Sequence, residues 1–288
     1  MYALIDSQKQ AHSIRRLCEV HGVSRSNYYA SKTRTACRER VDAPVIADIK
    51  SIHNTRFQRS YGSPRITAEL RDMGHVIGRK RVRRLMKMAG ISAVCKRRFK
   101  KTTDSKHDNP IANNVLNRDF SVGKPQQRWV ADITYLDTQT SGLYLAAVMD
   151  LGTRKWVGFA VDTHMQASLC ERALNMAMTE EGGAPTLAHT DRGSQYTGED
   201  YTTLLEAHGI TSSMSRKANC WDNAAQESFF GTFKSEVGDT FIDLADAKRN
   251  IFDYWCFYNR KRRHSALGYM SPIEFEKRLD VEAELVHF

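Results

Sequence analysis

The sequence predicts an α/β domain built on a mixed five-stranded sheet with flanking helices, preceded by all-helical modules. Three strand-like segments, 128–137, 142–151 and 156–161, follow one another with short connections, which is typical of an antiparallel meander. Helical and strand-like segments then alternate up to residue 236, as they do in domains that cover a sheet with helices. The first ninety residues have helical periodicity only.

These patterns divide the 288 residues into five parts. We expect a helix-turn-helix module at 1–40, a second helical module at 41–91, a basic linker at 92–126, the α/β core at 127–240 and a helical extension at 241–288. Apolar residues make up 41% of the chain, which is enough for a sizeable core.

The first module has the pattern of two helices joined by a turn. Residues 13–21 are predicted to form a short helix, Gly22 a turn, and Ser24 the N-cap of a second helix that carries Arg25. This outline fits a helix-turn-helix, and a generic helical hairpin would share it.

The second module places basic side chains on one helix face. Helices are predicted at 44–57, 66–73 and 79–89. In the last of these, an apolar stripe lies opposite a cationic stripe, which suits a helix packed on its module and laid against phosphates. A solvated cationic face is the alternative. The candidates for DNA contact in the two modules are Arg25, Arg79, Lys80, Arg83 and Arg84.

The overall charge supports a polyanionic partner. The chain has 43 Lys and Arg against 33 Asp and Glu, which gives a net charge of +10 and a pI near 9.3. The segment 79–101 alone holds eleven Lys or Arg and no acid, and such a segment repels itself unless phosphates neutralise it. We therefore expect nucleic acid as a partner, and a merely basic protein is the alternative. The predicted linker, with few periodic apolar residues, is expected to be partly disordered without DNA.

Two strands and three helices complete the predicted α/β core. The strands are expected at 185–190 and 210–214, and the helices at 167–181, 201–208 and 223–236. The last helix has three phenylalanines to bury, so one of its faces must lie on the sheet.

Three carboxylates occupy positions that suit chemistry. Asp132 interrupts an apolar strand, where an unpaired charge is costly to bury. Asp191 lies where a strand runs out into a Gly/Ser turn, the place where α/β sheets put ligand-binding groups. Glu227 lies one turn into the last helix. Taken singly, each carboxylate is better explained as a helix cap or a surface ion pair.

Carboxylates that converge on one point need a cation between them. Ligands that are all oxygen select Mg²⁺ or Mn²⁺, and two such ions about 3.5–4 Å apart support in-line displacement at a phosphate. The six cysteines form no CxxC pair and have no His at zinc-ligand spacing, which argues against a structural zinc.

The sequence segments around the three carboxylates resemble those of a known family. WVADITYL, HTDRGSQY and NAAQESFFGTFKSE, in this order and at these spacings, closely resemble the catalytic domain of retroviral integrases and DDE transposases. The resemblance is closest to the OrfB-type transposase of the insertion-sequence family numbered three, and it covers nearly the whole chain. Residues 22–31 and 61–91 look like the helix-turn-helix modules of that family, and 258–269 looks like its C-terminal signature.

This resemblance implies a ribonuclease-H-like fold and a polynucleotidyl transferase. Asp132, Asp191 and Glu227 match the triad that holds two Mg²⁺ ions, for which Mn²⁺ can substitute, and Lys234 matches a basic position that follows the glutamate. The enzyme would cleave the ends of its insertion sequence and join the freed 3′-OH to DNA. The implied partners are the terminal inverted repeats and target DNA, the product of an upstream OrfA reading frame, and further copies of the chain on DNA.

Other polar residues are candidates for supporting roles, and most of them have two interpretations. His189 shares a strand face with Asp191 and either assists the site or is structural. Asn223 is expected to cap the helix that carries Glu227. Lys234 either holds a phosphate or pairs with Glu236 or solvent. The cationic turn at 259–264 suits phosphates or is simply solvated, and its DNA-contact candidates are Arg260, Arg262 and Arg263.

Two other functions compete with a transposase. A nuclease of the same fold would hydrolyse DNA without joining it, and a DNA-binding regulator would use the α/β domain as a scaffold only. No apolar run approaches the ~20 residues that span a bilayer, and the first residues do not form a signal peptide. We therefore expect a cytoplasmic protein associated with the bacterial nucleoid, without a membrane partner.

Overall fold

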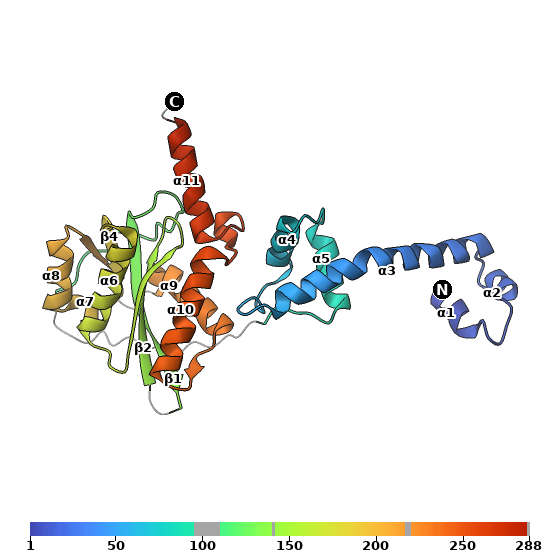
Figure 1. The fold of residues 1–288 in the computed structure, drawn as a ribbon, viewed down its shortest axis with the longest axis horizontal. Coiled ribbons are helices and arrows are strands. Elements are labelled where there is room, and N and C mark those ends of the chain that lie inside the picture. The colour runs from blue at the N-terminus through green and yellow to red at the C-terminus, as the bar shows by residue number, and fades with distance from the viewer. Residues whose placement is uncertain (95–109, 140–141, 217–219, 287–288) are drawn as a thin grey trace. The chain divides into compact units, whose positions relative to one another are not determined.

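The computed structural model describes residues 1–94, 110–139, 142–216 and 220–286 (Figure 1). The chain divides into two compact units, one of Met1–Thr55 with Gly62–Ser92 and one of Arg56–Tyr61 with Ala93–Phe288. Among the helices that the structure describes, none has both the length and the apolar character needed to cross a membrane.

The first unit is helical, as predicted. Its helices are α1 (Tyr2–Gln8), α2 (Ile14–Val20), α3 (Arg25–Asn54), α4 (Ser63–Asp72) and α5 (Arg79–Met88). The hydroxyl of Ser24 accepts the Asn27 N–H at 3.1 Å, which confirms the predicted N-cap. Gly22 takes φ 63° in the turn before it, a conformation that favours glycine.

Helix α3 is longer than the sequence pattern indicated. It runs for 30 residues, so the boundary expected between residues 40 and 41 falls inside it. Pro44, expected at a helix start, lies in its interior. Each end of α3 has its own packing: Tyr28 joins Ile5, Leu17 and Cys18 in a small cluster, whereas α4 and α5 pack against α3 elsewhere along its length. Tertiary packing therefore stabilises this helix across its proline.

The second unit contains a mixed sheet with the order β3-β2-β1-β4-β5. The strands are β1 (Arg128–Thr138), β2 (Gly142–Asp150), β3 (Trp156–Asp162), β4 (Leu187–Thr190), β5 (Thr211–Met214) and the short β6 (Thr240–Phe241), which pairs with β1. The meander β1–β3 is antiparallel, and β4 and β5 are parallel to β1. All five predicted strands are confirmed, and β6 is an addition of two residues.

Helices cover both faces of this sheet (Figure 1). Helix α6 (Ala167–Glu181) lies with α7 (Ser194–Thr197) and α8 (Glu199–Ala207) on one face, where the core includes Trp129 and Ala131. The other face carries α9 (Ala224–Glu236), which follows a 3-10 turn η1 (Cys220–Asn223), and α10 (Leu244–Arg260). There the Trp156 ring contacts the rings of Phe229 and Tyr254. A second 3-10 turn η2 (Ser265–Leu267) and α11 (Pro272–Val286) end the predicted helical extension.

Candidate active site

Asp132 and Asp191 lie at equivalent points of two neighbouring parallel strands. Strands β1 and β4 pair as far as Val130 and His189, and each aspartate lies two residues further along the chain. Because parallel strands advance by nearly the same distance per residue, this register places both aspartates at the point where the two strands separate. The sequence predicts that Asp132 interrupts a strand and that Asp191 ends one. The register shows in addition that both lie where β1 and β4 separate.

The Asp132 carboxylate is held by two donors. The Ile133 N–H donates to Oδ1 at 2.8 Å, and the amide Nδ2 of Asn223 donates to Oδ2 at 3.1 Å. Burial raises the pKa of Asp132 well above its ordinary value, and the negative charges of Asp191 and Glu227 raise it further. A bound cation would reverse this effect, since it favours the charged form of a carboxylate.

Asp191 begins the turn that follows β4. Its Oδ1 accepts the Gly193 N–H at 2.9 Å. A Cβ added at Gly193 would lie 3.1 Å from this oxygen and 2.9 Å from Oε1 of Gln195. Glycine at this position therefore lets the backbone close onto the carboxylate.

Glu227 reaches the same region from helix α9. Its side chain is exposed, and partial burial raises its pKa. The preceding residue, Gln226, is fully buried and donates from Nε2 to the Ala147 carbonyl at 2.8 Å. Ala147 is the partner of Asp132 in the β1–β2 ladder, so this bond fixes α9 against the strand pair that carries Asp132.

Asp191 and Glu227 are each close enough to Asp132 to raise its pKa, but the three carboxylates form an open arrangement. Within the described ranges, no three His, Cys, Asp or Glu side chains are grouped tightly enough to hold one metal ion. The donor chemistry nevertheless fits a divalent cation, because every ligand candidate is an oxygen, and burial together with the charges of Asp191 and Glu227 raises the pKa of Asp132. A fourth oxygen, Oδ1 of Asn223, is buried there and has no hydrogen-bond partner.

Asn223 occupies the N-cap position of helix α9, but its side chain does not cap the helix, which corrects the sequence prediction. Its side chain makes no capping hydrogen bond, and its backbone takes φ −117° and ψ 22° at the end of the 3-10 turn η1. An N-cap residue needs an extended conformation to turn its side chain back to the helix N–H groups. The Asn223 amide instead points to Asp132.

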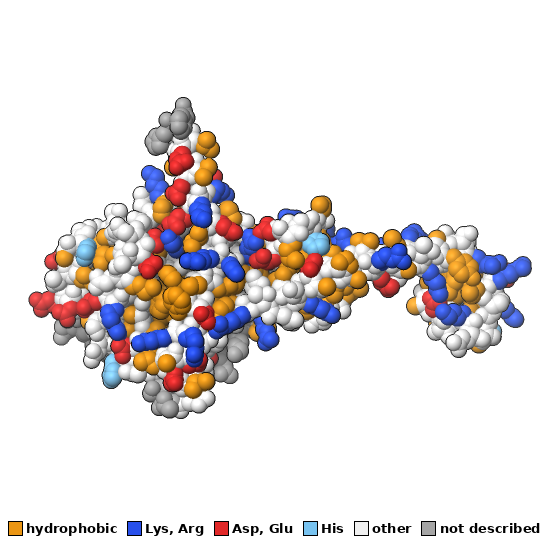
Figure 2. All heavy atoms as spheres, viewed as in Figure 1, with side chains coloured by type: hydrophobic (Ala, Val, Ile, Leu, Met, Phe, Trp, Pro, Cys, Tyr) orange, Lys and Arg blue, Asp and Glu red, His pale blue; other side chains and the backbone are white. Residues whose placement is uncertain are grey.

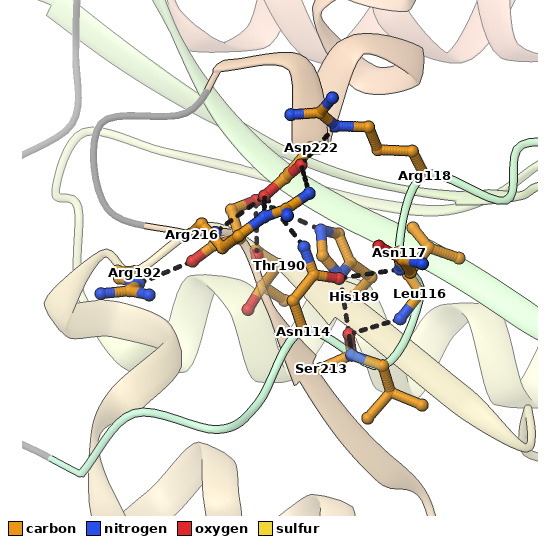
Figure 3. A network of polar contacts seen from close by, with 12 residues as sticks. Asn114, Leu116, Asn117, Arg118, His189, Thr190, Arg192, Ser213, Arg216 and Asp222 are labelled. Carbon is orange, nitrogen blue, oxygen red and sulfur yellow. Dashed lines mark hydrogen bonds and ion pairs between the residues drawn. The ribbon is translucent and has the colours of Figure 1, made fainter.

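A buried carboxylate that the sequence analysis missed anchors the start of this helix (Figure 3). Asp222 is fully buried and accepts hydrogen bonds from Arg118 Nε at 2.7 Å, Asn114 Nδ2 at 2.9 Å and three nitrogens of Arg216, each at 2.9 Å. The bonds from Arg216 hold the pKa of Asp222 well below its ordinary range, and Arg118 contributes. The only signal in the sequence was a charged residue directly before Asn223.

The same network holds part of the predicted linker in place. The N–H groups of Val115 and Leu116 both donate to the Ser213 hydroxyl of β5, at 3.0 and 3.1 Å (Figure 3). These contacts hold the part of residues 110–126 around Leu116 on the second unit. Residues 95–109 of the expected basic linker lie outside the described residues.

His189 makes structural contacts. It is fully buried, with Nδ1 2.9 Å from the Ser213 hydroxyl and Nε2 3.2 Å from the Ser215 hydroxyl. Burial lowers its pKa to about 4, so the ring is neutral at physiological pH. The geometry supports the structural interpretation of this residue, since both ring nitrogens are engaged with the strand beside β4 and its continuation.

Lys234 contacts the strand that carries Asp132. Its Nζ donates to the Tyr135 carbonyl of β1 at 2.7 Å. The carboxylate of Glu236, the partner expected in the alternative interpretation, is paired with Arg262. A role for Lys234 in holding DNA stays a prediction.

The basic candidates of the first unit differ in their contacts. Arg25, Arg79, Lys80 and Arg83 are exposed, and the last three line one surface hollow. Arg84 is also exposed, but it donates to the buried Asp42 at 2.7 Å, beside Arg81, so its guanidinium holds α5 to α3. On the face that Figure 2 draws, basic side chains are spread along both units rather than gathered in one patch.

Two of the three C-terminal basic candidates have side chains that are largely buried. Arg262 is 3% exposed and paired with Glu236, so its guanidinium is not accessible to DNA. Arg263 has a largely buried side chain that donates from Nη1 to the Tyr269 carbonyl at 3.2 Å. Asn259 is also buried and binds the backbone of Trp156. Only Arg260 of the three predicted arginines is exposed.

Family models match most of the chain. A model described as "Integrase core domain" matches residues 123–220, and a second model with the same description matches 208–272. A model described as "HTH-like domain" matches 39–99.

Curated relatives match over nearly their whole length. A 31 kDa protein of insertion element IS600 from Shigella sonnei is 41% identical, over 91% of this chain and 98% of that protein. Transposase InsF for insertion sequence IS3A from Escherichia coli K12 is 37% identical, over 96% of this chain and 98% of that protein. Transposase InsF for insertion sequence IS3 from Escherichia coli O111:H- matches to the same extent.

Solved structures match at low identity. A simian T-cell lymphotropic virus intasome in complex with PP2A regulatory subunit B56 gamma aligns at a TM-score of 0.47 and 12% identity, over 75% of this chain and 70% of that chain. The HTLV-2 integrase catalytic core domain in complex with magnesium aligns at 0.41 and 12% identity, over 53% of this chain and 97% of that chain.

Proposed function

The chain belongs to the transposase family of the IS3 insertion sequences, with an integrase catalytic core, and on this premise we propose that it cleaves the ends of an insertion sequence and joins the freed 3′-OH to DNA. The observation that carries this proposal is the juxtaposition of Asp132, Asp191 and Glu227. Their charges act together on the pKa of Asp132, although they come from β1, the turn after β4, and α9. In a structural role such repulsion would bring no benefit.

The residues that would hold divalent cations are these three carboxylates. Two bound Mg²⁺ or Mn²⁺ ions would supply Lewis acidity and charge neutralisation at the phosphate. Asp132 in β1 is kept in orientation by Ile133 and Asn223, and Asp191 directly after β4 is kept in orientation by Gly193. Glu227 lies on the exposed side of α9 and can adjust its side chain as the site fills.

The basic side chains of the first unit supply DNA binding. Arg79, Lys80 and Arg83 project from α5 within the HTH-like region, and their charges are available to phosphates. Terminal repeats and target DNA are the proposed ligands. Assembly of several copies on DNA, and cooperation with an OrfA product, belong to the same proposal, as does action at the bacterial nucleoid.

Removing charge from the triad tests the proposal. Asp132→Asn, Asp191→Asn and Glu227→Gln should each abolish cleavage and joining of a DNA substrate with the element's ends, because an amide keeps the shape but loses the charge that holds cations. DNA binding and folding should be retained in all three. Full activity in EDTA, or in any one variant, would overturn the proposal.

A pre-cleaved substrate separates a transposase from a nuclease of the same fold. An element end that already bears a 3′-OH should be joined to a second duplex by the wild-type chain in Mg²⁺. If the wild type cleaves uncut ends but never joins pre-cut ones, the enzyme hydrolyses DNA only.

A further inference from the structure

The side-chain amide of Asn223 has a hydrogen-bonded nitrogen and an oxygen without a hydrogen-bond partner, and this unpaired oxygen suggests a ligand. The side chain is 6% exposed. Its Nδ2 donates to Asp132 Oδ2 at 3.1 Å, whereas its Oδ1 is buried without a hydrogen-bond partner. A buried carbonyl oxygen without a partner is costly, so a group absent from the protein chain is expected to complete it.

The position of this oxygen limits what that group can be. Oδ1 and Nδ2 share one carbon, so Oδ1 lies within about 6 Å of Asp132 Oδ2. Two oxygens on opposite sides of one octahedral Mg²⁺ lie about 4 Å apart, since each Mg–O distance is about 2.1 Å. The amide oxygen is therefore near enough to enter the coordination sphere of a cation bound by Asp132, directly or through a coordinated water.

The backbone around Asn223 is fixed, which makes the placement of its amide reproducible. The preceding residue, Asp222, is tied by Arg118, Asn114 and Arg216. A second buried amide, Gln226, also has an unpartnered oxygen, but its Nε2 donates to a backbone carbonyl and not to a carboxylate. Asn223 is thus distinguished by its direct bond to Asp132.

We propose that Asn223 is a fourth oxygen donor of the metal site, whose Oδ1 binds the cation or its water while Nδ2 holds Asp132 in orientation. This inference rests on the proposed function, because it needs the carboxylates to bind a divalent cation. The amide suits this place, since it adds an oxygen without adding a charge to a site that already holds three acids.

The test measures binding of Mn²⁺ alone to the full-length chain, from the electron paramagnetic resonance signal of the free ion. Wild type should bind Mn²⁺, and Asp132→Asn should lose most of that binding. Asn223→Ala should bind at least about 10-fold more weakly, the size of effect seen when a residue that supports a metal ligand is removed. Asn223→Asp keeps Oδ1 and replaces Nδ2 by a second oxygen, so it cannot donate to Asp132, and it should bind Mn²⁺ at least as tightly as wild type.

Asn259→Ala is the matched control. Asn259 is a buried asparagine whose amide accepts the Trp156 N–H at 2.8 Å and donates to the Trp156 carbonyl at 2.9 Å. Its loss should lower the thermal midpoint in EDTA without weakening Mn²⁺ binding.

The outcomes separate the inference from the proposed function. No Mn²⁺ binding by the wild type, or undiminished binding by Asp132→Asn, would remove the metal site itself. If these two behave as expected, wild-type affinity in Asn223→Ala would overturn the inference alone. Equal weakening in Asn223→Ala and Asn223→Asp would also overturn it, because Asn223 would then act only as a donor to Asp132.

Discussion

The guanidinium of Arg262 and the carboxylate of Glu236 form a buried ion pair with two hydrogen bonds, each of 2.8 Å. Their side chains are 4% and 1% exposed. Glu236 is the last residue of α9 and also accepts the hydroxyls of Ser60 and Tyr254, at 2.6 and 2.8 Å. The pair therefore ties the far end of the helix that carries Glu227 to the C-terminal extension.

Arg262→Ala should reduce stability rather than DNA affinity. Removing one partner of a buried pair leaves an uncompensated charge and typically costs about 3–5 kcal/mol. Urea unfolding should show this loss, while the folded protein binds duplex DNA as the wild type does. Arg260→Ala, at the neighbouring exposed arginine, should leave stability unchanged and is the control. A stable Arg262→Ala variant with weakened DNA binding would contradict the structural role.

Substitutions on the exposed face of α5 should reduce DNA affinity rather than stability. Charge reversal at Arg79, Lys80 and Arg83 should weaken DNA binding and reduce the slope of log affinity against log salt by about 0.9 for each phosphate that the variant no longer neutralises. Fluorescence anisotropy over a salt series measures both quantities. Arg84→Glu is the contrasting variant, because Arg84 is paired with the buried Asp42 and its reversal should lower the thermal midpoint. Unchanged affinity and slope in the triple variant would exclude this face as a DNA surface.

Arg84 and Arg262 have contacts that could not be predicted from the sequence. Arg84 and Arg262 were assigned to DNA because each lies in a run of basic residues. Their acidic partners, Asp42 and Glu236, are 42 and 26 residues away in the chain. A run of cations looks the same in sequence whether its members face solvent or a distant buried acid, so only the tertiary contacts separate them.

The carboxylate positions were predictable for a different reason. Asp132 and Asp191 stand out as charges at strand positions, and the local pattern carries that information. The role of Asn223 was predicted wrongly, because Asn before a helix is normally a cap. The 3-10 turn η1 changes its backbone conformation and turns its amide to Asp132. Asp222 escaped notice because its partners, Asn114 and Arg118, lie in a stretch that has no periodic pattern.

His189 predicts a pH dependence of stability. Its folded pKa of about 4 lies below the ordinary value of 6.5, because burial disfavours the charged ring. The neutral ring therefore contributes stability that is complete above pH 6.5 and is lost as the pH falls from 6.5 towards 4, a shift that corresponds to about 3 kcal/mol. The free energy of unfolding measured across this range should fall more steeply for wild type than for His189→Gln. Parallel curves would show that His189 titrates normally.

Lys234 offers a prediction about DNA positioning. It follows Glu227 by seven residues, which is about two helical turns and about 10 Å along α9. Its Nζ already lies 2.7 Å from the Tyr135 carbonyl, three residues beyond Asp132 on β1. An ammonium has three donor hydrogens, so it can bind a carbonyl and a phosphate together. We therefore expect Lys234 to hold a backbone phosphate of the element's end beside the carboxylates.

Lys234→Ala should reduce cleavage and joining by about 100-fold, because small misplacements of a reacting phosphate are costly. Mn²⁺ binding should stay at the wild-type level, since the lysine carries the wrong charge to be a ligand. The thermal midpoint should fall only slightly, because the hydrogen bond to Tyr135 is worth about 1 kcal/mol. Lys234→Arg keeps a cation at the same place and should therefore recover part of the cleavage and joining activity. If Lys234 were purely structural, a cation at this position would not be needed for activity. Wild-type joining by Lys234→Ala would remove this residue from the site and leave the carboxylate assignment unaffected.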